Sequence, residues 1–354
     1  MLQQLTKQLQ GGAGLSADEV ATAIEGLVAE AASLDDKAAF LAALAGKGET
    51  IEEIAAFARE LKRRAIAVPI SDPVRHGEVL DIVGTGGDRL GTFNISTAAA
   101  VIAAAAGVNV AKHGNRAVTS KTGSADVIEA LGIPLDLTPA QAAQCLAERG
   151  FVFLFAQRYH PAFKHIAPAR RLCAERGQRT IFNFLGPLLN PANPSAMLVG
   201  VPRPELCEPL AHVLQELGVR RAMVVAGKVH LAPEAASDYV DEFSTLGPTV
   251  MAEFYHDRGF HASTFNPWQL PLLTAVLDDL RGGDREVNAS IVRAVLGGED
   301  HGPRRDAVRL NAGVALFVAG AVRSIDDGWE LAGAVIDDGR AARKLTELAR
   351  PFPG

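Results

Sequence analysis

VLDIVGTGGDRLGTFNIST, residues 79–97, joins a short apolar run to a glycine-rich turn and then to the first turn of a helix. The apolar run, Val79 to Val83, predicts a buried strand because it is bounded by glycines. The residues from Asn94 to Thr97 predict the start of a helix. A strand, a loop and a helix in this order are typical of an α/β domain.

The glycines of this stretch also indicate a ligand. Gly84, Gly86 and Gly87 let the backbone turn sharply and bring its N–H groups close to an anion. The helix start adds donors and the positive end of the helix dipole. The pattern fits neither the dinucleotide-binding nor the P-loop motif. We therefore predict phosphate binding here, with an ordinary strand-to-helix turn as the alternative.

The remaining chain divides into a helical beginning and a longer α/β part. The first 65 or so residues predict helices, two of them opened by the capping-box pairs Ser16–Glu19 and Thr50–Glu53. Further strands are expected at 107–111, at 151–155, around Val199 and at 222–225, and helices at 124–131, within 160–190 and from Pro271 onward. This order predicts a small N-terminal helical domain and a larger α/β domain with a mostly parallel central sheet, separated by a cleft.

Composition excludes several classes of protein. The net charge of −6 leaves no basic excess for a nucleic-acid backbone, so phosphate binding has to use a few placed groups. The three cysteines lie far apart without metal-ligand spacing, which favours a reducing cytoplasm. The first ten residues do not resemble a signal peptide. The apolar stretch 98–110 is shorter than the roughly 20 residues that cross a bilayer and predicts a buried helix that runs into a strand.

Polar residues follow the second predicted strand, in KHGNRAVTSKTGSAD at 112–126. Lys112 and Arg116 offer positive charge, while His113 and Asn115 offer hydrogen bonds. Ligands of α/β proteins bind at the carboxyl ends of strands. We therefore expect a second part of the site here.

Two later segments contain candidate binding groups. His160 is compatible with a buried structural histidine. Arg170 and Arg171 are compatible with solvated helix charges, although a guanidinium facing the cleft would pair with a carboxylate. The adjacent carboxylates Asp241 and Glu242 are hard oxygen ligands of the kind that magnesium prefers.

Taken together, these segments resemble the anthranilate phosphoribosyltransferase family of tryptophan biosynthesis. The resemblance extends over roughly residues 5–348. It rests on GTGGD at 84–88, NIST at 94–97, KHGNR at 112–116, GSAD at 123–126, YHPA at 159–162 and RTIFNFLGPLLNPA at 179–192. It implies a fold like that of class III nucleoside phosphorylases, a Mg²⁺ requirement and a homodimer joined through the helical domains. The composition adds the expectation of a cytoplasmic protein that binds neither nucleic acid nor membranes.

The resemblance also implies roles for individual residues. Lys112 and Arg170 would be catalytic. Ser96, Asp241 and Glu242 would bind the metal. Anthranilate would contact Gly84, His113, Asn115, Tyr159, His160 and Arg170. The donor, 5-phosphoribosyl 1-pyrophosphate (PRPP), would contact Gly84, Thr85, Gly86, Gly87, Asp88, Thr92, Asn94, Ser96, Thr97, Lys112, Asn115, Ser120 and Ser124.

The implied domains are discontinuous. A helical dimerisation domain would contain residues 1–70 and about 163–192, and a PRPP-binding α/β domain residues 76–162 and 193–354.

The segment 224–242, VVAGKVHLAPEAASDYVDE, departs from the family pattern. Ala226 replaces a histidine, Tyr239-Val240 replaces Gly-Leu, and about six residues are added, while Gln157 stands where proline is common. The departure leaves open a related transferase or phosphorylase that acts on another aromatic amine or base. A relative without catalysis that binds nucleic acid is the third alternative.

Overall fold

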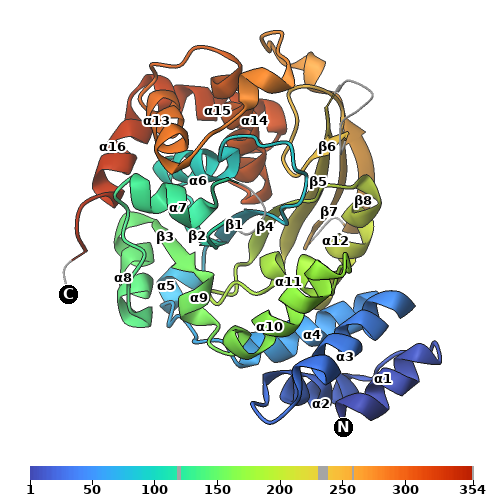
Figure 1. Ribbon diagram of the computed structural model, residues 1–354. Helices are drawn as coiled ribbons and strands as arrows, with labels where there is room; N and C mark the ends of the chain where they lie inside the picture. Colours follow the sequence, from blue (N-terminus) through green and yellow to red (C-terminus); the bar gives the residue numbers. More distant parts are fainter. Residues whose placement is uncertain (118–120, 230–237, 257–258, 353–354) are drawn as a thin grey trace.

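The computed structural model describes residues 1–117, 121–229, 238–256 and 259–352. A small helical unit lies at one end of a larger α/β unit, which confirms the predicted fold class (Figure 1). Within the described ranges, no helix is both long enough and apolar enough to cross a membrane.

The helical unit begins with four helices whose starts are readable from the sequence. They are α1 (Leu2–Gln10), α2 (Ala17–Val28), α3 (Leu34–Lys47) and α4 (Ile51–Arg63). Ser16 accepts a hydrogen bond from the backbone of Glu19, whose carboxylate accepts one from the backbone of Ser16. Thr50 and Glu53 form the same reciprocal cap at α4. Both predicted capping boxes are thus present.

Two helices from the middle of the chain complete this unit. α10 (Phe163–Glu175) contacts α2 and α3, and α11 (Phe182–Leu188) contacts α4. Ile166 and Leu185 are fully buried in the same apolar core as Phe40 and Phe57. This core continues onto one face of the sheet, so the helical unit is packed against the α/β unit.

The sheet has the strand order β3-β2-β1-β4-β5-β7-β8, and β6 pairs with β5. Its parallel part contains β1 (Val79–Gly84), β2 (Asn109–Gly114), β3 (Phe151–Phe155), β4 (Ala196–Gly200) and β5 (Arg221–Lys228). β6 (Tyr239–Val240), β7 (Thr249–Tyr255) and β8 (Gly259–Phe265) are antiparallel. The carboxyl ends of the five parallel strands therefore meet at one edge.

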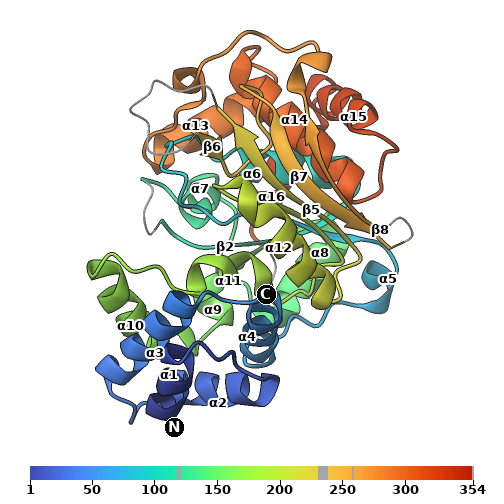
Figure 2. The same cartoon turned by 90° about the vertical axis from the view of Figure 1, so that its right-hand side faces the viewer.

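Helices cover both faces of the sheet (Figures 1 and 2). On one face lie α6 (Ile95–Ala105), α7 (Ser124–Ala130), α13 (Arg285–Leu296), α14 (Pro303–Val318), α15 (Ile325–Asp337) and α16 (Arg340–Leu348). On the other face, α12 (Cys207–Glu216) packs on β5 and β7, and α8 (Pro139–Arg149) packs on β3. The short helices are α5 (Asp72–Arg75), α9 (Ala156–Tyr159), η1 (Pro204–Leu206), η2 (Pro267–Gln269) and η3 (Leu277–Leu280).

Three expectations need correction. No strands were expected at 249–265, yet β7 and β8 form a hairpin there, and β8 is largely exposed. The chain from Pro271 is not helical throughout, because only η3 precedes α13. The second strand begins at Asn109 rather than at Gly107, whose φ of 98° belongs to the turn.

Candidate active site

The residues after β1 form a loop that we call the glycine loop, residues 84–88. Its first amide, that of Thr85, donates to the carbonyl of Gly200 at 2.9 Å. Gly86 and Gly87 then have φ values of 72° and 90°, a left-handed conformation that glycine adopts without strain. Both are exposed. The predicted sharp turn is therefore present at the carboxyl edge of the sheet.

Asp241 and Glu242, the acidic pair, follow β6 and return to this loop. Asp241 Oδ2 accepts from the N–H of Gly86 at 2.7 Å. Glu242 Oε1 accepts from the N–H of Ser96 at 3.1 Å. The chain thus brings together the proposed metal ligands Ser96, Asp241 and Glu242, although 146 residues separate Ser96 from Glu242.

The approach of Asp241 explains two glycines. A Cβ atom at Gly84 would lie 2.2 Å from Asp241 Oδ2. A Cβ atom at Gly200 would lie 1.6 Å from the backbone oxygen of Asp241. Neither position accepts a side chain unless Asp241 moves away, so glycine is required at both.

Three carboxylates crowd this place. Burial, and then repulsion from Asp88 and Glu242, raise the pKa of Asp241 well above its ordinary value. Burial raises the pKa of Glu242 to about 7, although Lys112 and Ser96 favour its charged form. Among the described residues no N–H or hydroxyl group donates to the buried Oδ2 atom of Asp88, and a hydrogen bond between Asp88 and Asp241 requires that one of the two carboxyl groups is protonated. A divalent cation fits such a place, because it supplies the missing partner and removes the repulsion.

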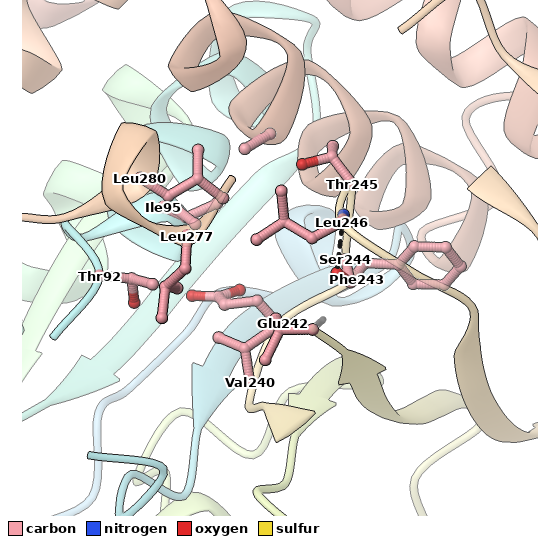
Figure 3. A pocket seen from close by; sticks show the side chains of 12 residues that line it. Thr92, Ile95, Val240, Glu242, Phe243, Ser244, Thr245, Leu246, Leu277 and Leu280 are labelled. Carbon is pink, nitrogen blue, oxygen red and sulfur yellow. Dashed lines mark hydrogen bonds between the residues drawn. The ribbon is translucent and has the colours of Figure 1, made fainter. Parts of the chain in front are cut away.

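In the part of the chain that the structure describes, no three or more His, Cys, Asp or Glu side chains are arranged to hold a metal ion by themselves. Magnesium is commonly bound by one or two carboxylates together with substrate phosphates. A small, mostly apolar pocket lies beside Glu242, whose carboxylate extends toward Thr92 and Leu277 (Figure 3). The apolar lining accounts for the raised pKa of Glu242.

The start of α6 differs from the expectation. We expected unpaired amides there, but the N–H of Ile95 donates to Phe93, those of Thr97 and Ala98 donate to Asn94, and that of Ser96 donates to Glu242. The polar groups left for an anion in the first turn are therefore side chains. The buried Oγ1 of Thr97 has no hydrogen-bond partner within residues 1–117, 121–229, 238–256 and 259–352. The carboxamide of Asn94 does not cap the helix.

Lys112 of β2 lies next to Ser96 at the start of α6, and the residue is 2% exposed. Its Nζ donates to the carbonyl of Ile82 and, at 3.2 Å, to Ser96 Oγ. Burial lowers the pKa of Lys112, while Asp81 and the acidic pair favour its charged form. The lysine is thus a buried cation directed at the serine and the carboxylates.

The segment after β2 needs one correction. Arg116 was expected to offer free positive charge, but its guanidinium forms ion pairs with Asp126 at 2.9 Å and Glu129 at 3.0 Å. Asn115 is exposed, and its Oδ1 accepts from Gln157 at 3.4 Å. Ser124 begins α7 and donates to the carbonyl of Asn115 at 3.5 Å. Ser120 lies outside the described residues.

His113 and His160, the histidine pair, come from β2 and from the start of the helical insertion. Their rings meet edge to face with centroids 5.3 Å apart. Burial lowers the pKa of His113 to about 3 and that of His160 to about 4, so both are neutral at pH 7. Each Nε2 atom is buried and has no hydrogen-bond partner in the described part of the chain. Tyr159 is also buried, and its hydroxyl has no hydrogen-bond partner among the described residues.

Aromatic rings connect the histidine pair with α10. Phe163 stacks on His160 at 5.3 Å and contacts Phe182 edge to face at 5.7 Å. The guanidinium of Arg170 lies 5.0 Å from the centre of the Phe182 ring. Arg170 forms no ion pair within the described ranges, and burial lowers its pKa. It is thus a half-buried cation available to an anionic ligand.

Lys62, in the last turn of α4, was not predicted as part of the site. It lies close enough to the histidine pair to lower the pKa of both imidazoles. Burial lowers its own pKa to about 8. Its place in the charged run ELKRR is typical of a solvated helix face, so the sequence held no signal of this position.

Comparisons with known proteins show the family to which the chain belongs. Two family models match the chain: "Glycosyl transferase family, a/b domain" over residues 76–342, and "Glycosyl transferase family, helical bundle domain" over residues 3–65. The anthranilate phosphoribosyltransferase of Symbiobacterium thermophilum is 47% identical over 351 residues, which cover 99% of this chain and 97% of that protein. The chain belongs to the anthranilate phosphoribosyltransferase family.

Solved structures of the family have the same fold. The anthranilate phosphoribosyltransferase of Thermus thermophilus has a TM-score of 0.85 at 40% identity, with 98% of each chain covered. The Saccharomyces cerevisiae enzyme in complex with PRPP and Mg has a TM-score of 0.85 at 27% identity, covering 98% of this chain and 96% of that chain. The predicted resemblance is confirmed.

Proposed function

We propose that the protein transfers the phosphoribosyl group of PRPP to the amine of anthranilate, which gives N-(5-phosphoribosyl)anthranilate and pyrophosphate. The observation that carries this proposal is the contact of the acidic pair with the glycine loop, through Asp241 and Gly86. This contact places the carboxylate oxygens that can bind a metal next to a loop that can bind a diphosphate. The family and its member solved with PRPP and Mg support the proposal.

The donor half of the site would bind the diphosphate and its metal. We propose that the glycine loop, Asn94 and Thr97 contact PRPP, and that Ser96 and the acidic pair hold Mg²⁺. The buried Oδ2 of Asp88, to which no N–H or hydroxyl group of the described residues donates, supports a cation at this place. Bound magnesium would neutralise charge that develops on the departing pyrophosphate. Lys112 adds a fixed positive charge beside Ser96, and such preorganised charge stabilises a transition state effectively.

The acceptor half would orient anthranilate. We propose that Arg170 pairs with the carboxylate and that the histidine pair and Tyr159 contact the ring and its amine. The lone pair of the amine attacks the anomeric carbon as the bond between that carbon and the pyrophosphate oxygen breaks. The ammonium group that results then loses a proton to solvent water. An aromatic amine is already neutral at pH 7, so no strong base is needed. The low pKa values of both histidines agree with an orienting role.

Where the structure describes it, the altered segment 224–242 keeps its place in the sheet. Ala226 is fully buried in β5 opposite Val250, and Tyr239-Val240 form β6 beside Gly227 and Lys228. Residues 230–237 lie outside the described residues. The strand nevertheless places the acidic pair at the glycine loop, which supports the family reaction.

The test is turnover with purified protein. Anthranilate fluorescence should fall when PRPP and Mg²⁺ are both present, and a chelator should stop the loss. Other aromatic amines, offered at the same concentrations, test the alternative acceptor. A protein that consumes another amine but no anthranilate would overturn the proposed acceptor.

We also propose the assembly and location that the family resemblance implies. Residues 1–70 and about 163–192 would form the dimerisation domain, and 76–162 and 193–354 the PRPP-binding domain. Leu34, at the start of α3, is 45% exposed and supports an apolar contact there. Three buried, unpaired cysteines support a reducing cytoplasm. Analytical ultracentrifugation should give twice the chain mass.

A further inference from the structure

Residues 280–283, which we call the bridging segment, connect the two loops of the proposed donor site. The N–H of Phe93 donates to the carbonyl of Leu280 at 3.0 Å, and that of Gly282 donates to the carbonyl of Gly91 at 2.9 Å. The hydroxyl of Thr122 donates to the carbonyl of Gly283 at 2.9 Å. The bridging segment is therefore bonded to the chain just before α6 and to the chain just before α7.

Asn288 of α13 extends this connection to a side chain of the site. It is 2% exposed, and its Oδ1 accepts from the N–H of Gly283 at 2.7 Å. Its Nδ2 donates to Asn94 Oδ1 at 2.9 Å. The fit is close, because a Cβ atom at Gly282 would lie 2.5 Å from Asn288 Oδ1.

These bonds fix which way each carboxamide points. A backbone N–H is only a donor, so the atom of Asn288 that faces Gly283 has to be its oxygen. The NH₂ group of Asn288 then faces Asn94, and since that group also only donates, the facing atom of Asn94 has to be its oxygen. The orientation of both amides thus follows from the backbone donor alone. The NH₂ group of Asn94 is left pointing away from Asn288, with no protein acceptor in the described ranges.

We propose that Asn288 is a positioning residue, which holds the carboxamide of Asn94 so that its NH₂ group faces an oxygen of the donor's phosphate groups. The inference rests on the proposed function. The turned-over amide would present a carbonyl oxygen to an anion, which is repulsive. Asn288 thus makes Asn94 an obligatory donor and favours an anionic ligand at the start of α6.

The near-isosteric Asn288→Asp variant tests the proposal. One oxygen of the aspartate still accepts from Gly283, but the other is now an acceptor facing Asn94. Asn94 should then turn over to donate to it and present its own oxygen to the phosphate. Hydrogen bonds to charged groups imply that the KM of PRPP rises on the order of tenfold, while the KM of anthranilate stays nearly constant.

A double-mutant comparison separates positioning from the added charge. The Asn94→Ala variant has no carboxamide at position 94 that could turn over. Asn288→Asp should therefore change the KM of PRPP far less in this variant than in the wild-type protein. If Asn288→Asp raised the KM of PRPP by the same factor in the wild type and in Asn94→Ala, the proposal would be overturned. Asn311→Asp is the matched control for a buried amide, because Asn311 is fully buried and bonds backbone groups of Phe243 and Ala307. It should lower Tm without coupling to Asn94.

If Asn288→Asp does not fold, Asn94→Asp gives a second test. The aspartate at position 94 keeps the bond from Asn288 but offers the phosphate an oxygen, so PRPP should bind more weakly than to Asn94→Ala. Equal or tighter binding would contradict the proposal. Calorimetry that measures the binding of PRPP and of inorganic pyrophosphate with Mg²⁺ tests the role of Asn288 independently of the proposed transfer reaction. A wild-type protein that binds pyrophosphate but consumes no anthranilate would refute the proposed function and leave the Asn288 comparison valid.

Discussion

At the scale of single residues, close approach between backbone and carboxylate determines the donor half of the site. Asp241 contacts the glycine loop only because Gly84 and Gly200 have no side chains. On the acceptor half, burial keeps His113 and His160 neutral. Arg170 stays cationic beside an apolar ring. Each feature leads to a substitution with a defined readout.

Gly200→Ala should disable metal-dependent catalysis while the chain still folds. The new Cβ would lie 1.6 Å from the backbone oxygen of Asp241, so the acidic pair has to move. Loss of one preorganised electrostatic group typically lowers kcat by about a hundredfold, and the half-saturating Mg²⁺ concentration should rise. Gly46→Ala is the control, because apart from its chain neighbours and the nearby backbone of α3 no heavy atom of the described residues lies within 4 Å of its Cβ position. An unchanged Mg²⁺ profile in Gly200→Ala would contradict the assignment of Asp241.

Arg170→Ala should mainly raise the KM of anthranilate. The guanidinium is half-buried beside Phe182, and no carboxylate of the described chain pairs with it. Loss of a charged hydrogen-bond partner predicts a KM roughly ten- to a hundredfold higher. Arg171→Ala on the exposed side of the same helix is the control. A change confined to the KM of PRPP would show that Arg170 belongs to the donor half.

His160 should make the protein less stable in mild acid. Its pKa is about 4 in the folded chain, against 6.5 as the ordinary value. Its contribution to stability is therefore complete above pH 6.5 and is lost as the pH falls toward 4, because the unfolded chain binds the proton first. Between about pH 7.5 and about pH 5 the free energy of unfolding should fall by about 2 kcal/mol more in the wild type than in His160→Asn. Urea denaturation of both proteins at both pH values measures this difference. An equal fall in the free energy of unfolding of the wild type and of His160→Asn would refute the prediction.

At the scale of elements, the site is assembled from strand ends and helix starts that are distant in the sequence. β6 delivers the acidic pair to the loop after β1, and the bridging segment joins that loop to the chain before α7. α4 belongs to the helical unit, yet its last turn brings Lys62 close to the histidine pair. The proposed acceptor half would therefore draw residues from both units.

Lys62→Met tests this sharing. Removal of the cation should raise the KM of anthranilate by up to about fivefold, the range of a partly exposed ion pair. It should leave the KM of PRPP nearly unchanged. Arg63→Met, whose side chain is 75% exposed and pairs with Glu60, is the matched control. Equal effects of the two substitutions would show that Lys62 acts only through general charge.

Much of this arrangement was readable from the sequence, for identifiable reasons. The capping boxes at Ser16 and Thr50 and the apolar run before Gly84 are local patterns, and their elements were predicted correctly. The hairpin of β7 and β8 was missed, because many of its residues face solvent and its apolar alternation is weak. Long-range contacts left no local signal. The bond between Asn288 and Asn94 spans 194 residues. Arg116 was assigned a free charge because its partners Asp126 and Glu129 lie 10 and 13 residues further on, in α7.

At the scale of the whole molecule, one continuous core joins the helical unit to a face of the sheet. Ile166 and Leu185, from the inserted helices, share this core with Met197 and Val224 of the sheet. The inserted helices and the residues just before them carry Tyr159, His160 and Arg170 of the proposed acceptor groups, while β2 of the sheet carries His113. The glycine loop lies at the carboxyl edge of the sheet. The shared core holds the proposed acceptor half and the proposed donor half against one another, and a transfer between two bound substrates requires such a fixed arrangement.

The central claim is that the two halves act together in one transfer reaction. The most direct measurement is the amount of pyrophosphate released for each anthranilate consumed, with PRPP and Mg²⁺ in excess. We predict one pyrophosphate per anthranilate, and almost none when anthranilate is left out. Pyrophosphate release that continues at the same rate without anthranilate would show hydrolysis of the donor and contradict this claim.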